Sequence, residues 1–403
     1  MPVPTGPDSR QVLFLPPYLP MTRRIRVLHI VRNLNDGGME RVVADLARAA
    51  DPAVFEMHVM VLRKFGRFAT SAGPHTTLHR APRMTRLSVL RPAALAAAIK
   101  RIAPDVVHAH SGLWYKVARA ARLAGVPVVY TDHGRQHPDP WTYRCLDREA
   151  ARLTRRVVGV SRALGDYLVT RVGVPAGKVE VIVNGIDLSM LDARLALAKG
   201  EHRRGDAPIV IGTLGRLEPV KGYDVLLAAL AQWPADGPRV EVLVAGDGSQ
   251  RNALEVLAHR LDVADRIRFI GWVEEPELFY PLLDVFVLSS RSEGTSVSLL
   301  EAMAASCPPV VTNVGGNGEV LGAELRDWLV PSEDPAALVA KLVTLAGSAT
   351  LRRRLGAVAR ARIAAVYDLS HTAQRYADLY HSVVQQSLVA DPTSRSPAYA
   401  RVE

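Results

Sequence analysis

The chain has 403 residues, which exceeds the length of one typical domain and suits two domains that each bury a core. Its composition, with 48% hydrophobic and 22% charged residues, is that of a folded globular protein and excludes a disordered or fibrous class. The net charge of +10 favours anionic partners, and no apolar run approaches the roughly 20 residues that a membrane-spanning helix needs.

The two cysteines, Cys145 and Cys307, lie far apart in apolar surroundings, so neither a disulfide framework nor a cysteine-based zinc site is expected. Their isolation favours a reducing, cytoplasmic compartment. Residues 1–22 lack a basic leader and carry prolines within their short apolar run, which argues against a signal peptide. We expect these residues to form a disordered extension.

From Arg26 onward, short β-branched runs alternate with longer amphipathic stretches rich in alanine and leucine, a pattern typical of βαβ units around a parallel sheet. The first half contains six candidate strands, namely IRVLHIV, FEMHVMVL, DVVHAH, VPVVYT, RVVGV and KVEVIV. They predict a doubly wound, Rossmann-like α/β domain over residues 23–190.

A polar stretch that begins near Leu188 interrupts this alternation, and we expect residues 191–207 to be a linker. The alternation then restarts with IVIGTL, VEVLVAG, RIRFIG, VFVLSS and PPVVT. We predict a second Rossmann-like domain over 208–366, a helix over 367–389 that packs back towards the first domain, and a disordered tail over 390–403. Because ligands bind outside the carboxyl ends of strands in open α/β sheets, two such domains define a cleft between them.

A basic stretch, residues 63–101, lies in the first domain, and no acidic residue occurs between Glu56 and Asp105. Its cations include Arg63, Lys64, Arg67, Arg80, Arg83, Arg86, Arg91, Lys100 and Arg101. Such a stretch could contact an anionic membrane surface or an acidic acceptor, or it could be an ordinary solvated face. Sparse aromatic residues and the lack of a binding motif disfavour nucleic acid.

The loop after the first candidate strand contains Gly37 and Gly38, and apolar residues at helical spacing predict a helix from about Gly38. Free N–H groups of a first helical turn attract phosphate, and glycine permits the close approach of a ligand. A plain turn between a strand and a helix would carry the same residues, so this loop alone leaves both interpretations open.

Two cations, Arg216 and Lys221, follow the first candidate strand of the second domain, in a loop that Gly215 and Gly222 keep tight. A guanidinium that binds oxygens in pairs and a compact ammonium together suit a diphosphate. The alternative is a pair of solvated cations at an ordinary loop.

A pair of glutamates brackets the start of another predicted helix: Glu293 precedes it and Glu301 lies in its second turn. Gly294, Thr295 and Ser296 lie between them, where free backbone N–H groups would face a diphosphate or sugar hydroxyls. Carboxylates can accept two hydroxyl groups of a sugar or a ribose. A glutamate within an apolar helix is costly to bury without such partners, which favours a binding role over a capping one.

Together these segments resemble family 4 of the retaining glycosyltransferases, whose GT-B fold places two Rossmann-like domains across a cleft. GGMERVV resembles the glycine motif of that family, GRLEPVKGYDVLLAAL its phosphate motif, and the two glutamates, eight residues apart, its carboxylate pair. VNGID, VAGDGSQRNALE, FIGWV and VGGNGEV extend the match from about residue 24 to 385. One departure is Gly318, where the family commonly has proline, and it affects only the expected rigidity of that loop.

The resemblance implies transfer of a hexose-type sugar from a nucleoside-diphosphate donor, and it implies a role for each matching residue. Glu301 would bind the ribose, Glu293 the hydroxyls of the sugar, and Arg216 with Lys221 the diphosphate. The remaining donor contacts would be Trp272 and Val273 beside the base, and Gly37 and Gly38 against the phosphates or sugar from the first domain.

The resemblance also places His133 near the reacting sugar, although a histidine at a strand end is often structural. The candidate catalytic residues are therefore His133, Glu293, Arg216 and Lys221. No cofactor is expected, because the chain lacks the D-x-D sequence with which many other glycosyltransferases hold a divalent ion. The cations and helix N-termini would then neutralise the leaving diphosphate. A zinc site formed by His108, His110, His133 and His137 is disfavoured, because these histidines have no carboxylate or cysteine partner in the sequence around them.

The resemblance implies that the anomeric configuration is retained. Because no residue plainly offers a nucleophile for double displacement, we expect attack on the face from which the diphosphate leaves. The acceptor would be a glycan, a lipid-linked sugar or a small molecule. Among enzymes, the alternative is a sugar-nucleotide epimerase of the same fold, which needs further acid and base residues. The other alternative is a non-catalytic protein that binds a nucleotide sugar. The intact glutamates and cations favour transfer over both.

Overall fold

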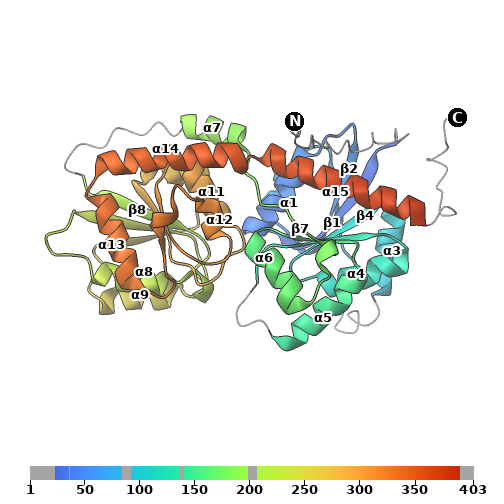
Figure 1. Cartoon of the computed structure of the whole chain (residues 1–403), viewed down its shortest axis with the longest axis horizontal. Coiled ribbons are helices and arrows are strands. Elements are labelled where there is room, and N and C mark those ends of the chain that lie inside the picture. The colour runs from blue at the N-terminus through green and yellow to red at the C-terminus, as the bar shows by residue number, and fades with distance from the viewer. Residues whose placement is uncertain (1–22, 36, 84–91, 136–139, 198–206, 391–403) are drawn as a thin grey trace, which may run out of the picture.

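The computed structural model describes residues 23–35, 37–83, 92–135, 140–197 and 207–390. Two α/β domains lie side by side along the long axis of the molecule (Figure 1). The first contains a seven-stranded sheet in the order β3-β2-β1-β4-β5-β6-β7, and the second a six-stranded sheet in the order β10-β9-β8-β11-β12-β13. All the strand pairs are parallel. The predicted architecture of two doubly wound domains is confirmed.

The strands of the first sheet are β1 (Ile25–Leu34), β2 (Phe55–Phe65), β3 (Thr76–Arg80), β4 (Val106–His110), β5 (Val128–Asp132), β6 (Arg156–Gly159) and β7 (Val179–Val181). Those of the second are β8 (Ile209–Leu214), β9 (Val240–Ala245), β10 (Ile267–Gly271), β11 (Val285–Leu288), β12 (Pro309–Thr312) and β13 (Leu329–Val330).

Helices connect the strands. Those before the second sheet are α1 (Gly38–Ala49), α2 (Phe68–Ser71), α3 (Ala93–Ile102), α4 (Trp114–Ala124), α5 (Trp141–Arg152), α6 (Arg162–Tyr167) and α7 (Leu188–Leu197). Those that follow are α8 (Tyr223–Ala231), α9 (Arg251–Arg260), α10 (Pro276–Phe279), α11 (Val297–Ala304), α12 (Asn317–Leu321), α13 (Pro335–Ala346), α14 (Ala349–Val366) and α15 (Leu369–Ala390). Within the described residues, every helix is too short or too polar to cross a membrane.

Both sheets have one strand more than the sequence predicts, and each extra strand lies at an edge. The missed strand β3, TTLHR, is polar and largely exposed, so it lacks the β-branched run that marks a strand buried on both faces. The missed strand β13 has only two residues. The count of six strands in the first domain was therefore wrong, and so was the count of five in the second, because hydrophobic runs identify central strands better than edges.

The segment between the domains begins with regular structure. Residues 188–197 form α7, which buries Leu188 and Leu191 in the core of the second domain. Residues 198–206 of the predicted linker lie outside the described part of the chain, as do residues 1–22 and 391–403 of the two predicted disordered ends.

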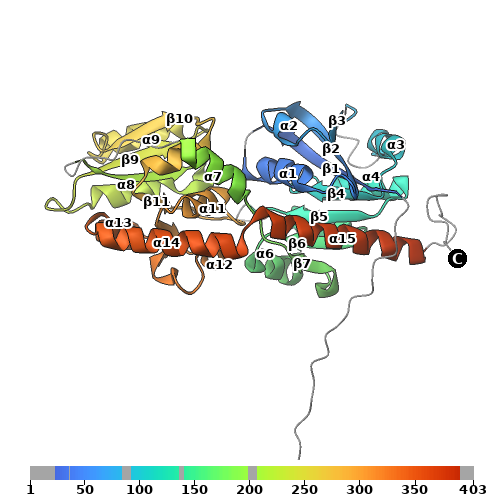
Figure 2. The ribbon, with the colours of Figure 1, turned by 90° about the horizontal axis from the view of Figure 1, so that it is seen from above.

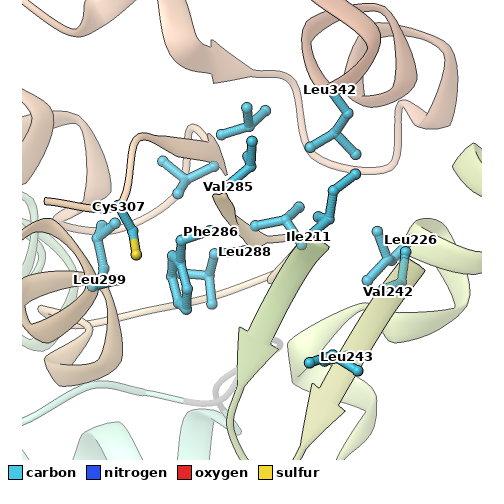
Figure 3. Packing of buried hydrophobic residues seen from close by; sticks show 14 of the residues in the cluster. Ile211, Leu226, Val242, Leu243, Val285, Phe286, Leu288, Leu299, Cys307 and Leu342 are labelled. Carbon is cyan, nitrogen blue, oxygen red and sulfur yellow. The ribbon is translucent and has the colours of Figure 1, made fainter. Parts of the chain in front are cut away.

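The second domain buries its core on both sides of its sheet. Ile211, Val285 and Phe286 on neighbouring strands pack with Leu299 of α11 and Leu342 of α13 (Figure 3). Because helices cover both faces, nearly every residue of the central strands is apolar, as expected for a parallel sheet.

The last two helices run along the whole molecule, with α14 on the second domain and α15 on the first (Figures 1 and 2). A parallel bridge between Ile186 and Asp368 marks the crossing point. Beyond it, α15 inserts Tyr376, Leu379 and Val383 into a core cluster that β1, β2 and α1 share. The final helix of the chain is therefore part of the core of the first domain.

Because Leu379 is 3% exposed in this cluster, Leu379→Ala should lower the free energy of unfolding of the first domain by about 2–5 kcal/mol, through lost burial and a residual cavity. Val389→Ala is the matched control on the same helix, because Val389 is 82% exposed and its truncation should change stability by less than about 0.5 kcal/mol. Urea unfolding measures the free energy of unfolding of both variants. Equal midpoints for the two variants would contradict the packing of α15 described above.

Candidate active site

The carboxyl ends of the two sheets face each other, and the predicted site residues lie on loops at those ends. Gly37 and Gly38 follow β1, His133 follows β5, and Lys221 follows β8. Glu293 follows β11, the strand next to β8, so the sheet order brings Lys221 and Glu293 together.

Glu293 is held through one oxygen. Its Oε1 accepts hydrogen bonds from Nζ of Lys221 and Oγ of Ser290, both at 2.6 Å. Gly222 makes this approach possible, because its φ is +62° and a Cβ there would lie 2.1 Å from the carbonyl oxygen of Ser289. The two described contacts of the carboxylate both go to Oε1, and charge-assisted bonds of this kind fix its orientation.

Gly294 brings the domains into contact. A Cβ on Gly294 would lie 2.2 Å from the carbonyl oxygen of His133, so only glycine fits at this distance. Next to it, Oγ1 of Thr295 donates to the carbonyl of Val160 at 2.5 Å, and Ser296 caps α11 by accepting from the backbone N–H of Leu299 at 3.4 Å. His133 and the Glu293 loop, predicted from separate segments, are therefore neighbours.

Glu301 is buried, with 3% of its surface exposed, in the second turn of α11. Its Oε2 accepts a hydrogen bond from Tyr280 OH at 2.6 Å, and its Oε1 forms an ion pair with Nη1 of Arg41 at 2.7 Å. The geometry of that pair leaves Oε1 without a hydrogen bond among the described residues. A carboxylate oxygen with an ion pair but no directed hydrogen bond can still accept a hydrogen bond from a ligand.

The sequence motifs did not assign a role to Arg41, which α1 carries across the cleft. Its guanidinium also contacts Glu277 at 2.6 Å and Asp45 at 3.7 Å. Burial opposes the charge, but the three carboxylates raise the pKa of Arg41, so it stays a cation. Burial also raises the pKa of Glu301, and the charge of Arg41 counteracts that shift. The only sequence signal was the position of Arg41 in GGMERVV, one turn after the glycines.

The other predicted donor contacts are Arg216, Trp272 and Val273, which are exposed or half-buried. Among the described residues, the side chain of Arg216 is exposed and has no hydrogen bond or ion pair. Trp272 is 40% exposed, and the guanidinium of Arg67 from the first domain lies 4.5 Å from its ring centroid. Val273 packs against the core of the second domain. The structure therefore does not bring Arg216 into contact with Glu293.

The two glycines place the N-terminus of α1 against the second domain. Gly37 has a φ of +143°, which favours glycine. A Cβ on Gly38 would lie 3.2 Å from Cγ2 of Val297, the first residue of α11. The N-termini of α1 and α11, whose free N–H groups both attract anions, therefore meet at the cleft.

Comparison with known proteins matches this arrangement to one family. The family model described as Glycosyltransferase Family 4 matches residues 36–190, and that described as Glycosyl transferases group 1 matches residues 197–362. Glycogen synthase of Mycobacterium tuberculosis is 31% identical over 290 residues, which cover 69% of this chain and 68% of that protein. The chain belongs to glycosyltransferase family 4.

Other relatives agree with this assignment. The D-inositol 3-phosphate glycosyltransferase of Thermobispora bispora is 28% identical over 90% of both chains. The crystal structure of Anabaena Alr3699/HepE in complex with UDP and glucose has a TM-score of 0.74 and 22% identity, and the match covers 89% of this chain and 100% of that one. The GT-B fold and the glycosyltransferase class predicted from the sequence are confirmed.

A cluster of buried histidines lies beneath the site in the first domain. Ring nitrogens of His29, His108 and His110 all lie within 4.8 Å of one another, a spacing that can suit a metal ion. Those nitrogens also form hydrogen bonds with one another and with neighbouring hydroxyl groups, and His110 continues the contacts to His133. The sequence pattern did not point to His29, and His137 lies outside the described residues.

The cluster predicts a pH dependence of stability. Burial lowers the pKa of His29 to about 3 and that of His133 to about 3, whereas an unfolded histidine titrates near 6.5. Below about pH 6.5 the unfolded chain therefore binds protons that the folded chain refuses until about pH 3, so the free energy of unfolding should fall as the pH drops through this window. Urea midpoints between pH 7.5 and 4.5 measure the slope.

The matched variants are His29→Gln and His75→Gln, because His75 is exposed. His29→Gln should flatten the pH slope, whatever its effect on absolute stability, while His75→Gln should leave the slope as it is. Comparing slopes removes the contribution of carboxylates such as Glu301, which all variants share. Parallel slopes in the three proteins would mean that His29 does not stay neutral in the folded chain.

Proposed function

We propose that this glycosyltransferase is a retaining, metal-independent enzyme that moves a hexose from a nucleoside-diphosphate donor. The observation that carries the donor class is the buried Oε1 of Glu301, which forms an ion pair with Arg41 but has no well-directed hydrogen-bond donor among the described residues, beside the meeting point of two helix N-termini. A ribose hydroxyl supplies such a donor, and the helix N-termini favour the adjoining phosphates.

The diphosphate is proposed to bind between Arg216, Lys221 and these N-termini. Arg216 is exposed with no partner for its side chain among the described residues, so its guanidinium is free to meet phosphate oxygens in pairs. Lys221 already touches Glu293, and a diphosphate next to it would share that ammonium. Positive charge at this position stabilises the leaving group, which is the contribution that a metal makes in other enzymes.

Glu293 is proposed to bind the sugar. Lys221 and Ser290 both bind its Oε1 and so fix the orientation of the carboxylate. Its Oε2 is then available to accept hydrogen bonds from sugar hydroxyls. Neither carboxylate is assigned as a covalent nucleophile. The acceptor hydroxyl would then attack on the face from which the diphosphate leaves, and the anomeric configuration would be retained.

The choice of base follows the structural relatives. Crystal structures of Anabaena Alr3699/HepE contain UDP and UDP-glucose, so a uridine donor is the first to test. Trp272 and Val273 are proposed to flank the base. Arg67, whose guanidinium lies over the ring of Trp272, would be next to them. An epimerase would release an altered nucleotide sugar, and a non-catalytic binding protein would release nothing, so one product assay separates the three functions.

The two glutamates should respond differently to substitution. Glu301→Gln should weaken both UDP and UDP-glucose roughly ten- to a hundredfold, because it removes about 1.5–3 kcal/mol of charged hydrogen bonding to a ribose that does not react. Glu293→Gln should leave UDP affinity nearly intact and lower the transfer or hydrolysis rate of UDP-glucose by a similar factor. Calorimetry with UDP and steady-state rates measure the two effects.

The matched control is Glu149→Gln, an exposed glutamate of α5 that forms an ion pair with Arg152 on the same helix. The same rates should persist in excess EDTA, and loss of turnover that magnesium or manganese restores would refute the metal-independent mechanism. GDP- and ADP-sugars extend the screen if uridine donors fail. Normal transfer by both glutamate variants would refute the proposed donor site.

We also propose that the basic stretch 63–101 holds the first domain on an anionic lipid surface, near a lipid-linked acceptor. Arg80, Lys100 and Arg101 are exposed, and Arg80 and Arg101 line one pocket between β3 and α3. Because each such cation contributes about 1 kcal/mol near a membrane, replacing all three with Gln should lower binding to phosphatidylglycerol vesicles roughly a hundredfold. Co-sedimentation of the protein with these vesicles measures the loss of binding.

The control for this experiment is the pair Arg353→Gln and Arg354→Gln, which removes exposed cations from α14 on the second domain. Those variants should bind vesicles like the unmodified protein. Equal vesicle binding by all the proteins would point to a soluble acceptor.

A further inference from the structure

A large cavity lies where the two domains meet, beside the edge strands β7 and β13 of their sheets. We call it the edge cavity. Its volume is about 1050 Å³, which is the size range of sites for small-molecule ligands. The end of β7 and the start of α15 line it from one side, and α12, β13 and the end of α14 line it from the other. None of the described residues that line it belongs to the donor site proposed above.

Positive charge dominates the lining of the edge cavity. Four of the described lining residues are arginines, namely Arg162, Arg326, Arg362 and Arg375, whereas one is a carboxylate, Glu319. Arg375 forms an ion pair with Glu180 at 2.7 Å, which neutralises it. Arg162 and Arg326 are exposed, and their side chains have no hydrogen bond or ion pair among the described residues. The edge cavity therefore has more positive than negative charge.

Arg362 is fixed in the wall of the edge cavity. Its Nε donates to the carbonyl of Val320 at 2.5 Å and its Nη2 to the carbonyl of Glu319 at 2.6 Å. Gly322 makes room for the guanidinium, because a Cβ there would lie 2.3 Å from Cζ of Arg362. Carbonyl groups hold the guanidinium without cancelling its charge, and its ion pair with Glu324 is long, at 3.9 Å. Arg362 therefore contributes a positive charge at a fixed position.

The carboxylate of Glu319 is already bound to the other domain. Its Oε2 accepts a hydrogen bond from the backbone N–H of Arg162 at 3.0 Å, and its Oε1 from that of Ala163 at 3.1 Å. These amides begin α6 of the first domain, whereas Glu319 belongs to α12 of the second, and the two helices lie next to each other where the domains meet (Figure 1). Among the described residues, Glu319 forms no ion pair with an arginine. It connects the domains and leaves the guanidinium groups uncompensated.

Charges from both domains act on the hydroxyl of Tyr367 in the edge cavity. Burial raises the pKa of this hydroxyl, and the positive charges of Arg362 and Arg162 counteract the rise. Arg162 belongs to the first domain and Arg362 to the second. Cations held near one another in a concave site repel, and an anion between them removes that repulsion. The edge cavity is therefore suited to an anion that contacts both domains.

Gly318 leaves space in the edge cavity. A Cβ there would lie 3.3 Å from Oδ1 of Asn313 and 3.7 Å from Cδ1 of Leu329, and both of these residues line the cavity. This is the position at which the chain lacks the proline that the family commonly has. Gly318 is the second residue of α12, and proline is tolerated in the first turn of a helix. Glycine at this position therefore matters for the cavity, which a proline ring would narrow.

We propose that the edge cavity binds a small soluble compound that carries two or more phosphate groups. Arg162 of the first domain and Arg326 with Arg362 of the second hold the compound, and Gly318 leaves room for it. Guanidinium groups bind phosphate oxygens in pairs, so three of them can hold more than one phosphate group. The edge cavity is separate from the donor site, so this binding does not rest on the function proposed above.

Calorimetry with inorganic tripolyphosphate tests the edge cavity. The titrations use one ionic strength, because salt screens unspecific attraction between exposed charges. Arg162→Gln and Arg326→Gln should each weaken binding about tenfold or more, as expected when a charged hydrogen bond is lost. Arg354→Gln is the matched control, because it removes an exposed guanidinium from α14 outside the edge cavity and should leave the Kd unchanged. Weaker binding in both cavity variants would mean that the compound contacts both domains.

Substitutions of Gly318 test the space in the edge cavity. Gly318→Pro should weaken tripolyphosphate binding more than Gly318→Ala does, because the proline ring is larger than a methyl group. Urea unfolding of both variants checks that they fold. Binding that stays unchanged in a folded Gly318→Pro variant would refute the role of Gly318.

Arg216→Gln separates the edge cavity from the donor site, and it should leave binding to the cavity unchanged. No tripolyphosphate binding by the unmodified protein, or equal binding by it and both cavity variants, would overturn the proposal. Binding that is lost in Arg216→Gln but kept in Arg162→Gln and Arg326→Gln would also overturn it, because tripolyphosphate would then occupy the donor site. Cavity variants that lose only their binding to phosphatidylglycerol vesicles would mean that these cations contact a lipid surface instead of a soluble compound.

Discussion

The distance between the two domains is set by contact of backbone against backbone. A Cβ on Gly294 would lie 2.2 Å from the carbonyl oxygen of His133, and one on Gly315 would lie 1.8 Å from the carbonyl oxygen of Glu293. Because no side chain fits in these spaces, the loops after β5, β11 and β12 form one unit at the cleft. Glu293, His133 and the N-terminus of α11 have their relative positions only because glycine lets these loops touch.

The buried charges around Glu301 depend on the same contact. Arg41 reaches Glu301 and Glu277 because α1 and α11 meet end to end at Gly38 and Val297. Burying ions carries a large desolvation penalty, so such pairs contribute little net stability. Their effect here is positional. They align the first turn of α1 with the oxygen of Glu301 that still lacks a hydrogen bond.

The sequence predicts those features of the fold and of the site that depend on a local residue pattern or on the order of strands in a sheet. Hydrophobic runs such as IRVLHIV mark central strands, and parallel order places Lys221 beside Glu293. The short edge strands β3 and β13 carry no such run. Arg41 looks like a solvated helix residue until α11 is placed against α1. Tyr376 and Tyr380 look like ordinary apolar positions, and only their contact with β4 and β5 gives their hydroxyl groups a partner.

The place of α15 in the chain also constrains how the protein folds. His108 and Tyr380, which share a hydrogen bond, are 272 residues apart, and the core of the first domain needs side chains from the last helix. Domains generally fold from the N-terminus as the ribosome makes them, but here the first sheet emerges long before the helix that covers one of its faces. That face stays open until the second domain has been synthesised. The second domain, which contains its own core, is therefore the first that can fold completely, and the first domain closes last over its histidines.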